Sequence, residues 1–268
     1  MNIVIENCSS PGASFTENTN SVILKCYSWI QEHPNCKKTF KEFRLDLQKE
    51  KGINDNNARN IYPFLKNCGF IRYNRNEIVN YNNFFTNNGL AYIRVLEAIK
   101  LLKDEGLNSV EKKEAHEKLI LIKQDIIMEG LKKLLKVPDS NYKMEYVSCI
   151  RFLLKFERIN KIEFAYLLYE KNHDMISYLD NMNNNILSYR NGDIDIEVSI
   201  SVRNDIKLRK ETGRERRLET ISFLTAYTYI LGTLNQAGIV KKHNNTFEFN
   251  ENKRTWVEEL LMEVLKNE

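Results

Sequence analysis

Apolar residues recur at helical spacing in the first hundred positions, and turn-forming residues divide them into separate segments. The first helix is expected over residues 18–32, before the sequence His-Pro-Asn. Its apolar face consists of Val22, Ile23, Cys26, Tyr27, Trp29 and Ile30. A second helix is expected over residues 39–50, before Gly52. The pattern therefore predicts a pair of helices at the start of the folded region.

A third helix is expected from Asn54 or Asp55, either of which can cap the first free N–H groups. Its apolar face consists of Ala58, Ile61, Leu65 and Cys68. Pro63 should bend or shorten this helix, because proline lacks a backbone N–H and its ring clashes with the preceding turn. Gly69 can end the helix in a left-handed conformation.

Two β-prone runs, residues 70–74 and 77–85, follow Gly69 and predict a hairpin. The next helix is expected over residues 87–106. The order helix, helix, helix, hairpin, helix is that of a winged helix, a variant of the helix-turn-helix. We therefore expect a winged-helix-like domain over residues 16–104, preceded by an N-terminal arm at 1–15.

Residues 105–143 predict a helical connector between two lobes, and a dimerising coil is not expected because the heptads do not persist. A second winged-helix-like domain is expected over 144–268, with a polar insertion at 172–213. A long helix of this domain runs into Gly238. A hairpin and one more helix follow it. The predicted fold class is mainly α with small β-hairpins (α+β).

One sequence pattern occurs twice. "FLKNCGFIRYNRNEIV" at 64–79 and "TLNQAGIVKKHNNTFEF" at 233–249 share a helix end, a glycine, two apolar residues and a basic, Asn-rich turn. Once the first hairpin is allowed about five extra residues, alignment of the two glycines also pairs Phe85 with Phe249 and Tyr92 with Trp256. The pattern predicts the same unit used twice.

Composition excludes several classes of protein. The hydrophobic fraction of 42% is that of a folded chain, and the sequence has no apolar run long enough to cross a membrane and no secretory signal. The five cysteines are scattered and never spaced as CxxC, so they are expected to be reduced thiols in a cytoplasmic protein without structural zinc. No cofactor is expected.

Positive charge is concentrated in one stretch. Residues 203–217 contain seven basic and three acidic side chains, so their surplus of four equals the net charge of +4 of the whole chain. Arg and Lys in such a stretch suit the phosphates of a nucleic acid.

A winged helix exposes the start of its third helix and the tip of its hairpin, which can reach base edges and phosphates of duplex DNA. Asn pairs well with adenine and Arg with guanine, because each can form two hydrogen bonds to one base edge. The candidate DNA-binding residues are Asn56, Asn57, Arg59, Asn60, Arg72, Arg75, Arg203, Lys207, Arg209, Lys210, Arg214, Arg216, Arg217, Thr220, Lys241 and Lys242. The same faces would also be solvated in a winged helix that serves as a protein-interaction subunit or a transcription regulator.

In layout, residues 16–265 resemble the DNA-recognition region of type IIS restriction endonucleases of the AlwI and FokI kind. The resemblance rests on Phe152, Leu153, Leu154 and Lys155, on Glu163, Phe164 and Ala165, and on the later "NQAGIV". It implies recognition of a specific duplex sequence by tandem winged helices, usually joined to a separate nuclease domain. This chain looks too short to carry both parts in the usual form.

The same resemblance implies where catalytic residues of a nuclease would lie. Such nucleases have an acidic residue that is followed, further along the chain, by the triplet Asp/Glu-x-Lys. The carboxylates of the acidic residue and of the triplet hold Mg²⁺. The best match is Asp195 followed by Asp205 and Lys207, although the usual preceding proline is missing and similar triplets occur elsewhere. A Mg²⁺-dependent endonuclease is therefore the alternative to a binding protein.

The leading expectation is a protein that binds a specific double-stranded DNA sequence, as the recognition module of a restriction or phage-defence system. A separate nuclease or methyltransferase chain is the expected protein partner, and no catalytic activity is expected in this chain.

Overall fold

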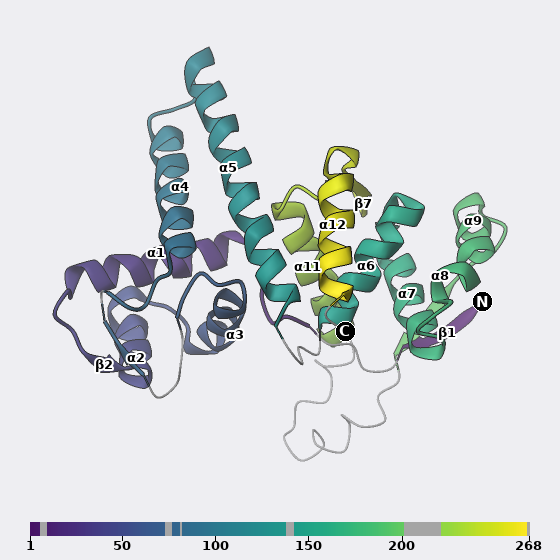
Figure 1. The fold of residues 1–268 in the computed structure, drawn as a ribbon, viewed down its shortest axis with the longest axis horizontal. Coiled ribbons are helices and arrows are strands. Elements are labelled where there is room, and N and C mark those ends of the chain that lie inside the picture. The colour runs from purple at the N-terminus through teal and green to yellow at the C-terminus, as the bar shows by residue number, and fades with distance from the viewer. Residues whose placement is uncertain (6–9, 73–76, 81, 138–141, 201–220, 267–268) are drawn as a thin grey trace. The chain divides into compact units, whose positions relative to one another are not determined.

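The computed structural model describes residues 1–5, 10–72, 77–80, 82–137, 142–200 and 221–266 (Figure 1). The fold is mainly helical with small sheets of two or three strands, which confirms the predicted fold class at that level. The chain forms two compact units. We call Gly12–Pro138 the N-lobe, and Met1–Pro11 together with Asp139–Glu268 the C-lobe.

The N-lobe elements follow the expected order with one additional short strand. They are α1 (Glu17–Glu32), β2 (Lys38–Thr39), α2 (Phe40–Lys51), α3 (Asp55–Asn67), β3 (Ile78–Val79), α4 (Asn87–Asp104) and α5 (Val110–Leu135). β2 pairs antiparallel with β3, and Ile71 forms an isolated bridge with Phe85. The helix expected as a connector, α5, is continuous and packs against α3 and α4 within this lobe.

Pro63 does not shorten α3, which continues to Asn67. The proline lies on the exposed face of the helix. Water can therefore reach the carbonyl that has lost its helical N–H donor, which reduces the energetic cost of an interior proline. Of the two expected effects of Pro63, bending or shortening, the shortening does not occur.

Phe70 is at the centre of the N-lobe core. Its ring lies 5.0 Å from the ring of Tyr92 in α4 and 5.3 Å from that of Phe15, which precedes α1. α4 approaches the Phe70 backbone at Gly89, where a Cβ atom would lie 2.0 Å from the Phe70 carbonyl oxygen. α5 approaches the Phe70 ring at Gly130, where a Cβ atom would lie 3.1 Å away. Two glycines thus let two helices pack directly on the residue that follows Gly69.

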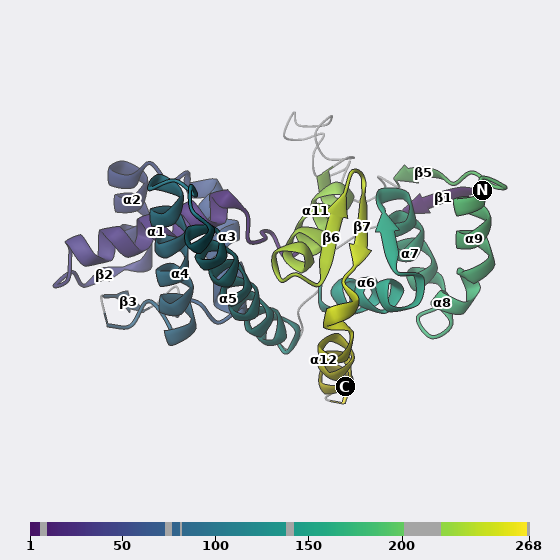
Figure 2. The same cartoon turned by 90° about the horizontal axis from the view of Figure 1, so that it is seen from above.

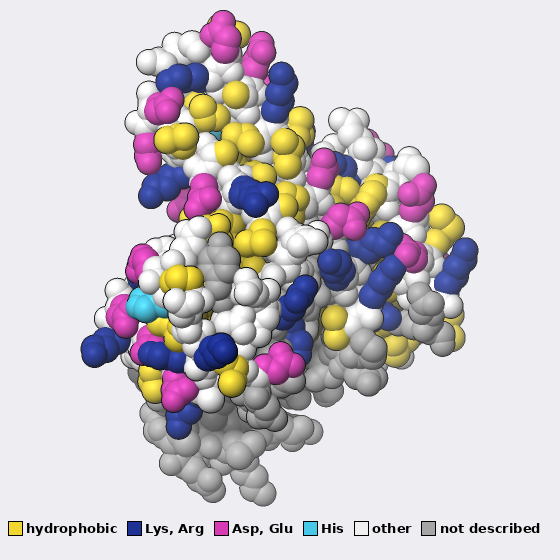
Figure 3. All heavy atoms as spheres, turned by 60° about the vertical axis from the view of Figure 1, so that its left-hand side comes forward, with side chains coloured by type: hydrophobic (Ala, Val, Ile, Leu, Met, Phe, Trp, Pro, Cys, Tyr) yellow, Lys and Arg dark blue, Asp and Glu magenta, His cyan; other side chains and the backbone are white. Residues whose placement is uncertain are grey.

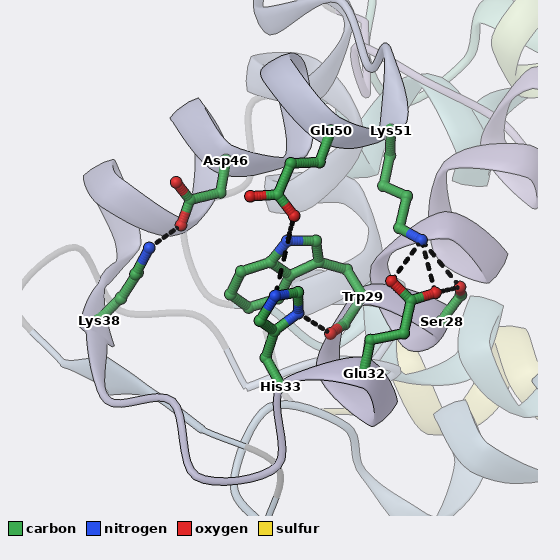
Figure 4. A network of polar contacts seen from close by, with 8 residues as sticks. All are labelled: Ser28, Trp29, Glu32, His33, Lys38, Asp46, Glu50 and Lys51. Atoms are coloured by element: carbon green, nitrogen blue, oxygen red, sulfur yellow. Dashed lines mark hydrogen bonds and ion pairs between the residues drawn. The ribbon is translucent and has the colours of Figure 1, made fainter.

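Polar contacts join α1 to α2 (Figure 4). The buried Trp29 donates its indole N–H to Glu50 Oε2 at 2.7 Å, and the His33 ring stacks on the indole at a centroid distance of 4.2 Å. Lys51 Nζ lies 2.6 Å from Glu32 Oε1, and this hydrogen bond lowers the pKa of the Glu32 carboxyl. These contacts fix the first two helices, on which α3 packs.

The C-lobe repeats the helix, strand, helix, helix, hairpin order around a longer insertion. Its elements are β1 (Asn2–Ile5), α6 (Lys143–Phe156), β4 (Arg158–Asn160), α7 (Lys161–His173), α8 (Tyr178–Asn181), α9 (Asn183–Asn191), β5 (Glu197–Ile200), α11 (Ile221–Gln236), β6 (Val240–His243), β7 (Thr246–Phe249), the 3₁₀ helix η2 (Glu251–Lys253) and α12 (Arg254–Leu265). The three-stranded sheet has the antiparallel order β4-β7-β6.

The N-terminal strand pairs with the insertion. β1 runs parallel to β5, with Ile3 opposite Val198, and contacts α7 (Figure 2). The Met1 ammonium group donates to the Asp195 carbonyl oxygen at 2.6 Å. The first residues of the chain are thus part of the C-lobe, although the N-lobe follows them directly in sequence.

Arg190 of α9 attaches the insertion to the C-lobe core. Its Nε donates to Glu163 Oε1 at 2.6 Å, and its two terminal nitrogens donate to the carbonyl oxygens of Phe156 and Arg158. The Glu163 side chain is only 1% exposed, and its other oxygen accepts the Asn160 N–H at the start of α7. One guanidinium group therefore bonds the Glu163 carboxylate and two backbone carbonyl groups where α6, β4 and α7 meet.

We predict that Gly89→Ala destabilises the N-lobe by about 3 kcal/mol or more, because the added methyl group collides with backbone rather than with a mobile side chain. Gly106→Ala is the control: no atom lies within 4 Å of its Cβ position, so only the left-handed backbone costs energy, about 1 kcal/mol. Urea unfolding followed by circular dichroism measures both. Equal losses in the two variants would contradict the close packing at Phe70.

We predict that Arg190→Met destabilises the C-lobe by about 3–5 kcal/mol, because Glu163 is left as a buried, unpaired charge. Adding Glu163→Gln removes that charge and should recover part of the loss. Lys155→Met, which breaks the exposed pair with Asp180, should cost less than about 1 kcal/mol. Thermal unfolding of the three variants tests this order, and a double variant no more stable than Arg190→Met would contradict it.

Candidate functional site

The two copies of the sequence pattern have the same backbone geometry. Gly69 and Gly238 both have a φ of 71°, in the left-handed region that glycine enters without steric cost. The Gly69 N–H donates to the Lys66 carbonyl oxygen, and the next N–H, of Phe70, donates to that of Leu65. Gly238 and the residue after it repeat both bonds, three and five residues back. These bonds define a Schellman motif at the end of each helix.

The residue that caps the helix after the hairpin braces this turn in both copies. Thr86 donates its N–H to the Phe70 carbonyl oxygen at 3.1 Å and its hydroxyl to the Gly69 carbonyl oxygen at 2.6 Å. Asn250 makes the equivalent bonds to Ile239 and Gly238, at 2.9 and 2.8 Å. The brace lies 17 residues after Gly69 but 12 after Gly238, the same five-residue difference that the sequence alignment allows between the hairpins.

The two lobes also share a feature that the sequence analysis missed. Thr39 begins α2 with a capping box in which Glu42 accepts its N–H, and Asn160 begins α7 with the same box closed by Glu163. A short strand ends at each box. In the N-lobe β2 pairs with β3, which lies between the bridged residues Ile71 and Phe85, and in the C-lobe β4 pairs with β7, the outgoing strand of the hairpin. The signal was the similarity of "TFKEF" at 39–43 to "NKIEF" at 160–164.

The outer face of α3 is polar. Ala58, Ile61, Leu65 and Cys68 are at most 3% exposed, as the periodicity predicted. Arg59 and Asn60 are exposed, and the Asn60 side chain lies beside Gly12. Asn56 and Asn57 belong to the first turn of α3, but their side chains are outside the described part of the structure.

Asp55 at the start of α3 is shared by two arginines. Arg44 Nε of α2 lies 2.7 Å from Asp55 Oδ1, and Arg59 donates from Nε and its terminal nitrogen to Asp55 Oδ2 at 3.0 and 2.9 Å. The Arg59 side chain is nevertheless 61% exposed. The Asp55 carboxylate holds the Arg59 guanidinium group beside the first turn of α3. Asp55 and its two arginine partners together carry a net charge of one positive unit.

Basic side chains also lie on the hairpins. Arg72 is exposed and its N–H donates to the Phe84 carbonyl oxygen, whereas Arg75 is outside the described residues. Lys241 and Lys242 of β6 are exposed, with Lys242 Nζ 6.0 Å from the centroid of the Phe247 ring. These positions match the expectation that the hairpins carry basic groups.

A carboxylate divides the exposed face of the C-lobe sheet. Glu248 of β7 lies opposite Lys241 on one side and Arg158 on the other, and His243 Nε2 is 3.7 Å from Glu248 Oε2. Arg158 carries no signal of this position in the sequence, because only the pairing of β4 with β7 brings it beside the hairpin. Three basic groups thus surround one acidic group.

The basic stretch at 203–217 lies outside the described part of the structure. Its candidate residues, together with Asp205 and the adjacent Thr220, lie outside the described part of the structure; they are Arg203, Lys207, Arg209, Lys210, Arg214, Arg216 and Arg217. Asp195 is described, and its Oδ1 accepts the Ile196 N–H at 2.9 Å. No metal site formed by three or more His, Cys, Asp or Glu is present among the described residues.

The described cysteines Cys26, Cys36, Cys68 and Cys149 are free thiols, as expected. Burial raises the pKa of the Cys26 thiol to about 12, despite a hydrogen bond with the Tyr62 hydroxyl. Burial also raises the pKa values of Cys68 and Cys149. These three groups are therefore poor nucleophiles in the folded protein.

Within the described part of the chain, no helix has the length and apolar character required to cross a membrane. Comparison of the chain with protein-family models, with curated proteins and with solved structures gave no match.

Proposed function

We propose that this protein binds a specific sequence of double-stranded DNA through two winged-helix lobes. In this proposal α3 and α11 are the recognition helices, and the hairpins that follow Gly69 and Gly238 are the wings. The observation that carries the proposal is the duplicated helix–glycine–hairpin unit. In each lobe, exposed basic side chains lie on the hairpin shortly after the glycine.

The strand pairing supports a winged helix most directly in the C-lobe. In a winged helix the short strand before the second helix pairs with the outgoing strand of the hairpin. β2 pairs with β3 in the N-lobe, and β4 pairs with β7 in the C-lobe. The C-lobe differs by an insertion between its second and third helices, which brings the basic stretch at 203–217 next to α11 in sequence.

The chemistry of the two lobes favours a division of labour. Arg59 and Asn60 on α3 can each form two hydrogen bonds to a purine edge in the major groove. Asp55 restricts the Arg59 guanidinium group, so fewer conformations are lost when it meets a base. The C-lobe contributes Lys241, Lys242 and the basic stretch, which suit phosphates rather than bases.

A restriction or phage-defence system is the proposed setting. The support is the resemblance of the C-lobe sequence to type IIS recognition regions, whose nuclease domain is separate. A nuclease or methyltransferase on another chain is therefore the proposed protein partner. A protein-interaction subunit or transcription regulator could share the fold, but a pure protein-interaction subunit would not bind duplex DNA.

We predict that selection from a random duplex library recovers a preferred sequence, and that affinity for it falls steeply with salt. Arg59→Ala should weaken binding by about 1–3 kcal/mol and relax the preference at one base pair. The double variant Lys241→Ala/Lys242→Ala should weaken preferred and random duplexes alike and reduce the salt slope by about one to two. Fluorescence anisotropy at several salt concentrations measures these effects.

Lys25→Ala is the matched control, because it removes an exposed positive charge from α1, which is neither a proposed recognition helix nor a proposed wing. It should leave the sequence preference unchanged. The proposal fails if the wild-type protein binds no duplex, or if Arg59→Ala and Lys25→Ala have the same effect on affinity and preference.

A further inference from the structure

Apolar side chains at the far end of the α4–α5 hairpin are exposed to solvent. Ile99 is the last buried residue of α4, and Ile127 is the first buried residue of α5. Between them, Leu101, Val110, Leu121 and Ile122 are 60%, 66%, 57% and 47% exposed. Figure 3 shows hydrophobic side chains gathered where α4 and α5 extend furthest from the rest of the N-lobe. Exposed apolar surface of this kind marks an interaction site.

The exposed end of α5 has a short coiled-coil pattern. Ala115, Leu119, Ile122 and Ile126 are spaced by four, three and four residues, which places them on one stripe of the helix. The pattern spans too few heptads for a long parallel coil. A hairpin, however, already supplies two helices, and two copies would complete a four-helix bundle.

The stripe is complementary to itself in the antiparallel direction. If two α5 helices cross at the peptide between Ile120 and Leu121, Leu119 of each copy meets Ile122 of the other, and Ala115 meets Ile126. The next positions outward on the same stripe are Lys112 and Glu129, which have opposite charges. The apolar layers would therefore end in two symmetric ion pairs.

The charges beside the stripe follow the same symmetry. Lys118 and Asp125 both lie one position before an apolar stripe residue, are exposed, and would face each other across an antiparallel pair. Glu111 and Lys132 would form the next pair outward. An isologous interface requires such reciprocity, since each contact occurs twice about a two-fold axis.

The net charge of the hairpin end also favours a second copy over an anionic partner. Residues 100–118 contain five lysines and five Asp or Glu residues, so their formal charge is zero within a chain of charge +4. A neutral surface with interspersed charges has no long-range attraction to nucleic acid or to an anionic membrane, and two such surfaces do not repel each other.

We propose that the protein forms a homodimer in which the α4–α5 hairpins of two copies pack as a four-helix bundle, with the α5 helices antiparallel about a two-fold axis. This proposal does not depend on the proposed DNA binding.

Sedimentation velocity of the full chain from about 1 to 100 µM tests the proposal without DNA. The wild type should show a reversible monomer–dimer equilibrium. Ile122→Lys should raise the dimer dissociation constant at least about tenfold, because it places a charge in an apolar layer. Ile176→Lys, at an 89% exposed position in the C-lobe, is the matched control and should leave the equilibrium unchanged.

A charge swap tests the antiparallel register. Lys118→Glu alone and Asp125→Lys alone should each weaken the dimer, because each places like charges together twice. The double variant should restore it, while circular dichroism verifies that all variants are folded. A wild type that stays monomeric, a dimer that Ile122→Lys does not weaken, or a double variant no tighter than the single ones would each overturn the proposal.

Discussion

The left-handed glycine that ends α3 in the N-lobe and α11 in the C-lobe is the constraint on which each lobe depends. It reverses the chain within two residues, so the hairpin leaves the helix in a fixed direction. The Schellman hydrogen bonds hold the turn from the side of the preceding helix, and Thr86 or Asn250, which caps the helix after the hairpin, holds it from the other side. A residue with a Cβ atom at Gly69 or Gly238 would strain the turn.

The surroundings of this turn differ between the lobes. In the N-lobe, Gly89 and Gly130 allow α4 and α5 to pack on Phe70, so the turn is enclosed by helices. In the C-lobe, the distinguishing contact is the Arg190 guanidinium group, which ties the insertion to the corner before α7. The same turn is therefore surrounded by different elements in the two lobes. The N-lobe adds an α-helical hairpin, and the C-lobe adds an insertion that leads in sequence into the basic stretch at 203–217.

Local patterns in the sequence predicted the helices well, because each has a strong apolar stripe and a clear end signal. They also predicted the duplicated turn, because glycine, its apolar neighbours and the Phe85 and Phe249 positions are close in sequence. The pairing of β1 with β5 was not predictable in this way, since nearly two hundred residues separate Ile3 from Val198. The Asp55 ion pairs depend on the packing of α2 against α3, and Arg158 reaches the hairpin only through sheet pairing.

Hydrogen–deuterium exchange with and without the selected duplex tests the central claim, that both copies of the unit face DNA. Protection is expected in residues 55–72 and 236–249, with no change in residues 100–122. Protection confined to one lobe, or found only outside these two segments, would contradict it.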